Sequence, residues 1–130
     1  KDIDNTTKFK SSWEADFARI LNFEKLSWQY EPETFLLSDG RHYTPDFKIG
    51  EKFVEIKNFL TEKDVNRHNL FSKDKSDKFV LVCGYKLFYG LVSLYIDNIT
   101  FECKSKARRS ILNNDIDLNG AIEVQKFVLS

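Results

Sequence analysis

The sequence predicts an α/β fold in which a mixed central β-sheet is flanked by helices. Three patterns indicate this class: an amphipathic stretch over residues 11–23, three period-two stretches joined by tight turns, and a continuous apolar run near residue 80. This order favours helices packed on a sheet. The 130 residues are expected to form one domain (1–130), with a core at about residues 11–84 and an extension of the same domain at 85–130.

Composition narrows the class of protein. Hydrophobic residues make up 42% and aromatic residues 15% of the chain, which favours a packed core over disorder. No stretch approaches the roughly 18 apolar residues of a membrane helix, so no membrane partner is expected. Cys83 and Cys103 lack the spacing of a metal-thiolate site. Unpaired cysteines are typical of a reducing, cytoplasmic protein.

Charge alone does not decide whether the chain binds a polyanion. The 20 basic and 20 acidic side chains balance, which excludes a polybasic tail, but residues 51–109 carry 12 basic and 8 acidic groups. A neutral protein can bind nucleic acid if its basic groups share one face. A mixed, solvated surface fits these counts equally well.

The first helix is expected to begin after Ser11. Ser11 and Glu14 have the spacing of a capping box, in which each side chain bonds the backbone of the other residue. The stripe that follows repeats at helical spacing and consists of Trp13, Phe17, Ile20, Leu21 and Glu24.

A meander of three strands is expected next, at residues 28–37, 41–49 and 52–59. Asp39-Gly40 and Gly50-Glu51 are the two-residue turns that would join them. A helix capped by Asn58 or Thr61 should then run to about residue 71, with a polar turn at 72–77. The apolar run at 78–84 predicts a strand buried on both faces.

The remaining elements have weaker patterns. We expect strands at residues 90–96, 99–103 and 122–129 and a short helix at 106–113.

The second hairpin concentrates the chemistry. If Gly50-Glu51 is a two-residue loop, Asp46 lies directly opposite Glu55, with Lys57 beside them. Alternation then places Tyr43 and Phe47 on the core face, with Asp46 and Glu55 on the other face.

Two carboxylates at about 5 Å repel each other by roughly 3 kcal/mol at an effective dielectric constant of about 20. A shared proton, the adjacent Lys57 or a divalent cation could relieve this repulsion. Mg²⁺ is usually held by one or two carboxylates and keeps several waters, so it fits such a pair well. Asp46, Glu55 and the backbone carbonyl of Ile56 would form the site. The alternative is a solvated strand face with a Glu–Lys pair.

The motif Tyr43-Thr44-Pro45-Asp46-Phe47, followed by Glu55-Ile56-Lys57, resembles the PD-(D/E)XK nuclease superfamily. Its form is similar to that of phage Holliday-junction resolving endonucleases and of transposon endonuclease subunits. Those relatives also carry a Ser-x-x-Glu on the first helix and a Tyr-Glu pair before the hairpin, which Ser11-Ser12-Trp13-Glu14 and Tyr30-Glu31 match here. The resemblance covers about residues 11–84 and implies a restriction-endonuclease-like fold.

The resemblance also implies residue roles. Asp46 and Glu55 would ligate one or two Mg²⁺ ions, for which Mn²⁺ would substitute, and Glu14 would complete the site directly or through water. Lys57 would orient or help to deprotonate the attacking water. Glu14 also fits a purely structural role, because it is the capping-box glutamate.

The sequence gives less support for assigning other polar residues to the site. Glu33 would pair with Asp46 if Asp39-Gly40 forms a two-residue turn. His42 could contact phosphate, and His68 is expected on a solvated helix face. The densest basic cluster fits phosphate contacts or a solvated helix start equally well, and consists of Lys104, Lys106, Arg108 and Arg109.

The sequence therefore predicts a magnesium-dependent endonuclease that hydrolyses DNA phosphodiester bonds, with branched or junction DNA among its candidate substrates. A two-fold homodimer is the simplest arrangement for cutting both strands. The alternatives are an RNA-cleaving relative and a non-catalytic nucleic-acid-binding module of the same fold.

Overall fold

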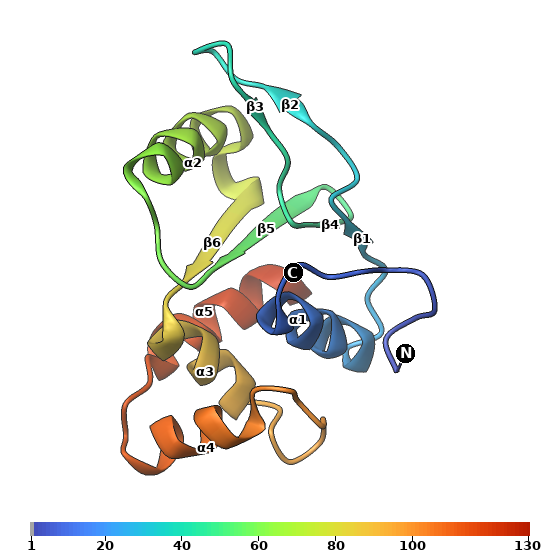
Figure 1. The fold of residues 1–130 in the computed structure, drawn as a ribbon, viewed down its shortest axis with the longest axis vertical. Coiled ribbons are helices and arrows are strands. Elements are labelled where there is room, and N and C mark those ends of the chain that lie inside the picture. The colour runs from blue at the N-terminus through green and yellow to red at the C-terminus, as the bar shows by residue number, and fades with distance from the viewer. Residues whose placement is uncertain (1) are drawn as a thin grey trace.

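The computed structural model describes residues 2–130, which form helices on both faces of a sheet (Figure 1). The α-helices are α1 (Ser12–Phe23), α2 (Glu62–Lys75), α3 (Tyr85–Ser93), α4 (Lys104–Leu112) and α5 (Leu118–Leu129), and one 3₁₀ turn, η1, spans Ser76–Lys78. The strands are β1 (Gln29–Tyr30), β2 (Phe35–Leu36), β3 (His42–Tyr43), β4 (Phe47–Ile49), β5 (Lys52–Lys57) and β6 (Phe79–Cys83).

The main sheet is mixed, as the sequence predicted. Its four strands have the order β1-β4-β5-β6, and β2 and β3 form a separate two-stranded ribbon. β4 is antiparallel to both β1 and β5, whereas β5 and β6 are parallel and are connected through α2. This crossover brings the end of β5 and the start of α2 together at one end of the sheet.

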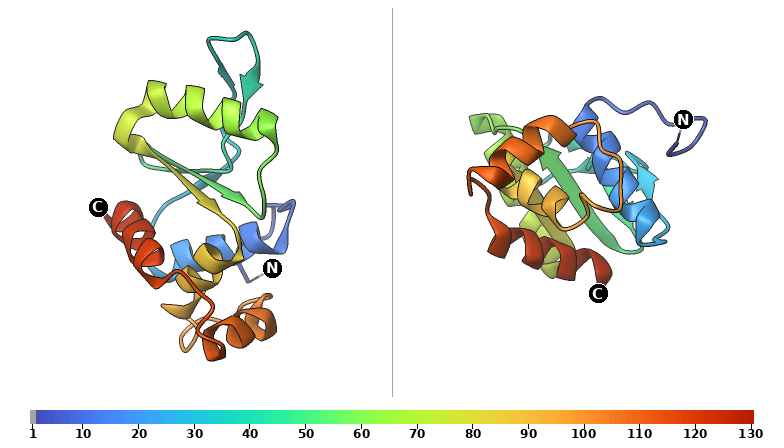
Figure 2. Two further views of the ribbon diagram at one scale, coloured as in Figure 1. Left: turned by 90° about the vertical axis from the view of Figure 1, so that its left-hand side faces the viewer. Right: turned by 90° about the horizontal axis from the view of Figure 1, so that it is seen from below.

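The helices cover both faces of this sheet. α2 lies across one face, whereas α1, α3 and α5 lie against the other, and α4 lies beyond α3 (Figures 1 and 2). The C-terminal helices therefore complete the same layer as α1.

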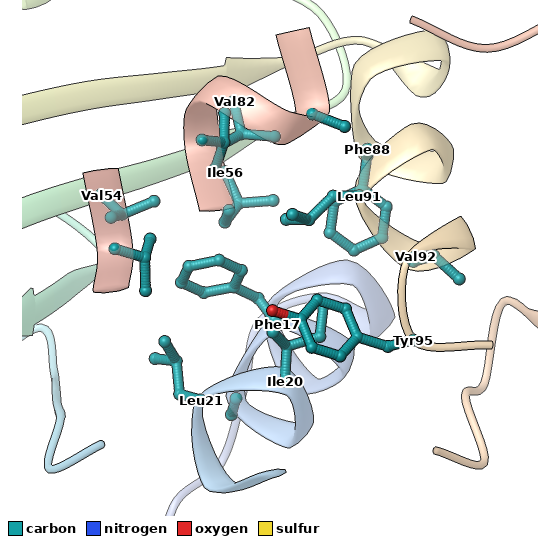
Figure 3. Packing of buried hydrophobic residues seen from close by; sticks show 14 of the residues in the cluster. Phe17, Ile20, Leu21, Val54, Ile56, Val82, Phe88, Leu91, Val92 and Tyr95 are labelled. Atoms are coloured by element: carbon teal, nitrogen blue, oxygen red, sulfur yellow. The ribbon is translucent and has the colours of Figure 1, made fainter. Parts of the chain in front are cut away.

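Each face of the sheet has its own hydrophobic core. The larger core lies between the sheet and α1, α3 and α5, where Phe17, Val54 and Leu91 are buried (Figure 3). The smaller core lies under α2 and contains Leu37, Tyr43, Phe53 and Phe71. Tyr43 was predicted on the same core face as Phe47, but the backbone break after β3 places it on the α2 side, whereas Phe47 lies in the larger core.

The predicted first helix is confirmed, including its cap. The backbone N–H of Glu14 donates to Ser11 Oγ at 3.2 Å, which satisfies one of the free N–H groups at the start of α1. Phe17 and Leu21 lie on the buried stripe.

The meander is interrupted more often than predicted. β1 ends where Glu31 adopts a φ of 48° before Pro32, so residues 28–37 do not form one strand. Pro45, which has no N–H, lies in the break between β3 and β4. The first turn is also wider than predicted: the N–H of Leu37 donates to Arg41 O at 2.8 Å, which leaves a three-residue loop ending at Gly40 (φ 84°).

The predictions around α2 and β6 need smaller corrections. α2 continues to Lys75 through most of the predicted polar turn. β6 lies at the edge of the sheet, and Val82 is its one fully buried residue, so the strand is not buried on both faces.

The predicted C-terminal strands at residues 90–96, 99–103 and 122–129 are wrong, whereas the helix at 106–113 is confirmed as α4. In α5 the buried residues Ala121, Val124 and Val128 recur at spacings of three and four, which is a helical period. Packing against the same core selects helix for these short apolar stretches.

Candidate active site

The hairpin of β4 and β5 brings Asp46 and Glu55 together. Its register pairs Phe47 with Val54 and Ile49 with Lys52, as the two-residue turn predicted. Asp46 directly precedes β4, and its backbone N–H donates to Glu55 Oε1 at 3.1 Å. The two acidic residues therefore meet at the open end of the hairpin.

Hydrogen bonds fix one oxygen of each carboxylate. Asp46 Oδ2 accepts from the backbone N–H of Ile56 at 2.8 Å, and Glu55 Oε1 accepts from the hydroxyl of Tyr43 at 2.9 Å. Within residues 2–130, no N–H or hydroxyl group donates to the other two oxygens, Asp46 Oδ1 and Glu55 Oε2, although the carboxyl of Glu14 lies within hydrogen-bond reach of Asp46. Each carboxylate thus has one anchored oxygen and one with capacity for a ligand.

The site is costly to ionise. Asp46, Glu55 and Glu14 are all at least nine-tenths buried. Burial, followed by the charges of Glu55 and Glu14, raises the pKa of Asp46 to about 9. Burial and the charge of Glu55 also raise the pKa of Tyr43, which keeps its hydroxyl protonated as a donor. Asp46 therefore tends to keep its proton, and a cation must offset the repulsion between the carboxylates when Asp46 ionises.

These carboxylates open into a cavity of about 690 Å³. Glu14, Asp46, Glu55, Ile56 and Lys57 all contribute to its lining, so the structure collects every residue that the sequence assigned to the catalytic site. The basic side chains on its wall come from four separate parts of the chain and are Lys10, Lys57, Arg67 and Lys106. An acidic floor with basic walls can hold a cation and a phosphate together.

Glu14 serves the helix cap and faces the cavity at the same time. Its Oε1 accepts from Ser11 Oγ at 3.0 Å, so this side chain is hydrogen-bonded to the N-cap residue of α1. The same carboxylate is close enough to raise the pKa of Asp46. The two roles weighed from the sequence are therefore compatible in one side chain.

α2 supports Lys57 through Asp64. Lys57 Nζ lies 3.9 Å from Asp64 Oδ1, and Arg67 Nη2 donates to the same oxygen at 2.6 Å. The N–H of Asp64 donates to Thr61 Oγ1, so the cap of α2 fixes this residue. The arrangement keeps the Lys57 ammonium at the cavity wall.

Side chains alone do not form a complete metal cage here. Within residues 2–130, no group of three or more His, Cys, Asp and Glu side chains is arranged to hold a metal ion. Mg²⁺ does not require such a group, because it usually retains several waters and binds one or two carboxylates. The free oxygens of Asp46 and Glu55, in a buried pair that needs positive charge, therefore fit this ion, and Glu14 fits a contact through water.

Two sequence predictions about neighbouring residues are wrong. Glu31, not Glu33, reaches the site: its N–H donates to Asp46 O at 2.7 Å, because the strand breaks at Pro32. Glu33 instead pairs with Lys48 on the outer surface. His68 is buried against Tyr43 and Phe79 and does not lie on a solvated face.

Several residues that surround the site were not predicted from the sequence. Tyr43 was assigned to the wrong face, and Lys10 and Arg67 were not assigned to the site at all. For the buried face of α2 the sequence held a usable signal. Asp64, His68 and Phe71 recur at intervals of four and three, and residues at such intervals share a helix face.

The C-terminal basic cluster reaches the cavity through one residue. Lys106 lines it, whereas Lys104, Arg108 and Arg109 do not. Asp16 on α1 holds the start of α4 in place, since its carboxylate accepts from the N–H groups of Glu102 and Cys103 at 2.8 and 3.0 Å. Residues 85–130 therefore contribute directly to the wall of the site.

No protein-family model, curated protein or solved structure matches this chain. Within residues 2–130, no helix is both long and apolar enough to cross a membrane.

Proposed function

We propose that this protein is a divalent-metal-dependent endonuclease that hydrolyses DNA phosphodiester bonds. The observation that supports the proposal most strongly is the buried cluster of Asp46, Glu55 and Glu14, which raises the pKa of Asp46 to about 9 in a cavity walled by lysine and arginine. A chain that only bound nucleic acid would gain nothing from burying acids that repel both each other and a phosphate. This consideration argues against the non-catalytic module.

The motif in this cavity also supports a restriction-endonuclease-like fold, as the resemblance to PD-(D/E)XK nucleases implies. Asp46 and Glu55 come from adjacent segments of an antiparallel hairpin, and Lys57 follows Glu55 by two residues on the same strand. The helix α1 carries Glu14 into the same cavity. Three separate pieces of backbone thus supply the motif residues: α1, the segment before β4, and β5.

In this mechanism the carboxylates of Asp46 and Glu55 would hold Mg²⁺ or Mn²⁺, together with the carbonyl of Ile56 and with Glu14 through water. When bound, the ion would polarise the scissile phosphate and lower the pKa of a water molecule. The oxygen of the attacking water forms a bond to phosphorus while the bond from phosphorus to one bridging oxygen breaks, and that oxygen takes up a proton.

Lys57 acts on the water and the phosphate in this proposal. Its ammonium group orients the water and offsets the negative charge that develops on the phosphate oxygens. Asp64 keeps Nζ at the wall of the cavity. Lys10, Arg67 and Lys106 bind neighbouring phosphates of the nucleic acid.

Nuclease assays with supercoiled plasmid and with a four-way junction test the proposal, each with Mg²⁺ or with a chelator. We expect cleavage that requires the metal and falls by about 10³-fold in Asp46→Asn, since a metal contact contributes several kcal/mol to such a reaction. Asp97→Asn makes the same chemical change at an exposed site and should cleave normally.

Metal-indifferent binding without cleavage of any substrate would overturn the proposal in favour of a binding module. Cleavage of RNA but not DNA would assign the chain to the RNA-cleaving alternative. A preference for the junction over the plasmid would identify branched DNA as the substrate. The two-fold homodimer stays a prediction.

A further inference from the structure

α2 is a largely hydrophilic helix, and two of the three side chains that it buries are polar. Its buried residues are Asp64, His68 and Phe71, which share one face of the helix at spacings of four and three. Phe71 fills the small hydrophobic core and Asp64 supports Lys57. His68 lies between them, and neither the capping nor the packing of α2 requires a histidine there.

His68 is buried without a hydrogen-bond partner. The side chain is about 5% exposed, and neither ring nitrogen hydrogen-bonds any residue within 2–130. The rings of Tyr43 and Phe79 flank it at centroid distances of 5.5 and 6.0 Å. An unsatisfied buried donor costs about 1–3 kcal/mol, so this position favours a partner for the imidazole.

A carboxylate oxygen of Glu55 lies close to the His68 ring. His68 Nε2 lies 3.7 Å from Glu55 Oε2, slightly beyond hydrogen-bond length. Glu55 Oε1 already accepts from Tyr43 and from the backbone of Asp46. A small movement of His68 toward Glu55 would therefore form a hydrogen bond to the second oxygen. With both oxygens bonded, the plane of the carboxylate would be fixed.

His68 acts through Glu55 rather than on the substrate. It is not among the residues that line the cavity, although Asp46, Glu55 and Lys57 are. Carboxylates that ligate metals are commonly held by a further hydrogen bond, and loss of such a partner typically weakens metal affinity about 10–100-fold.

We propose that His68 is a positioning residue that donates from Nε2 to Glu55 Oε2 and thereby orients this carboxylate for the divalent cation. The proposal rests on the proposed metal-dependent function. Tyr43 and His68 then hold the two oxygens of Glu55 from separate elements, β3 and α2, so that one lone pair of Oε2 faces the cation.

The test measures Mn²⁺ binding to the protein without nucleic acid, from the loss of the free-ion signal in electron paramagnetic resonance. His68→Gln retains an amide donor near Nε2, whereas His68→Phe and His68→Leu fill the space without a donor. We expect the Kd for Mn²⁺ to rise about 10–100-fold in both variants without a donor and to stay within a few fold of wild type in His68→Gln.

Leu70→Ala is the matched control on the same helix, because Leu70 packs on the small core and does not line the cavity. It should lower the melting temperature without changing the Kd. The proposal is overturned if the donor-free variants that fold bind Mn²⁺ as tightly as wild type, or if His68→Gln binds as weakly as they do. Absence of Mn²⁺ binding by the wild-type protein would overturn the proposed function itself, which is a separate outcome.

Discussion

The surroundings of Asp46 strongly oppose its ionisation. Its pKa rises from an ordinary value of 3.8 to about 9, so between these values the folded protein retains a proton that the unfolded chain has released. The stability of the metal-free protein should therefore fall with rising pH in this range, by up to about 1.4 kcal/mol per pH unit through this group. Urea denaturation at pH 5 to 9 in chelator measures this slope.

Asp46→Asn should flatten the pH dependence and make the metal-free protein more stable than wild type at pH 8, because the amide carries no charge to bury. Asp97→Asn should leave the slope unchanged. Addition of Mg²⁺ at pH 8 should stabilise wild type and not Asp46→Asn, since only ionised Asp46 binds the ion. A wild-type slope as shallow as that of Asp46→Asn would contradict the assigned pKa.

At the scale of elements, the first turn of α1 combines a helix cap with a wall of the site. Ser11→Ala removes the acceptor for the Glu14 N–H and should lower the free energy of unfolding by about 1 kcal/mol, with little effect on cleavage per folded molecule. Glu14→Gln retains a side chain that can hydrogen-bond to Ser11 but removes a charge from the cavity. Glu14→Gln should therefore reduce the cleavage rate and leave the free energy of unfolding unchanged or higher.

Chemical denaturation and single-turnover cleavage of the two variants separate these roles. If Glu14→Gln cleaves at the wild-type rate, Glu14 is a capping residue alone. If Ser11→Ala loses cleavage to the same extent as Glu14→Gln, the orientation of α1, and not the charge of Glu14, is what the site requires.

At the scale of the whole molecule, the charge balance of the chain conceals a local basic wall. The net charge is zero, yet Lys10, Lys57, Arg67 and Lys106 meet at one cavity. Lys106→Ala should weaken binding of a DNA duplex and reduce the slope of log K against log salt by about 0.9, because one phosphate contact is lost. Fluorescence anisotropy with Ca²⁺ in place of Mg²⁺ measures both quantities.

Lys126→Ala is the control for this measurement, because Lys126 lies on α5 beside Glu123 and outside the cavity. It should leave the salt slope unchanged. Equal effects of the two variants would indicate that DNA binds over a diffuse surface and not at the cavity.

The sequence predicted the register of the second hairpin better than it predicted the elements around that hairpin. A two-residue turn at Gly50-Glu51 and strict alternation were enough to place Asp46 opposite Glu55. The observed register pairs the adjacent residues Phe47 and Val54, and the N–H of Asp46 donates to the Glu55 carboxylate. The same reasoning misplaced Tyr43, because Pro45 interrupts the strand and alternation does not carry across a break. It also assigned strands to α3 and α5, since short apolar stretches satisfy both periods until a partner surface selects one.

By itself, the sequence determined the local features: the capped first helix and the hairpin with its two acids. Each of these depends on residues close together in the chain, whose geometry follows from turn chemistry and periodicity. The tertiary structure alone decided that α2 places His68 and Asp64 behind Glu55 and Lys57, and that α4 brings Lys106 to the same cavity. These contacts join segments far apart in the sequence, and burial of the two cores, which no local pattern encodes, determines which segments meet.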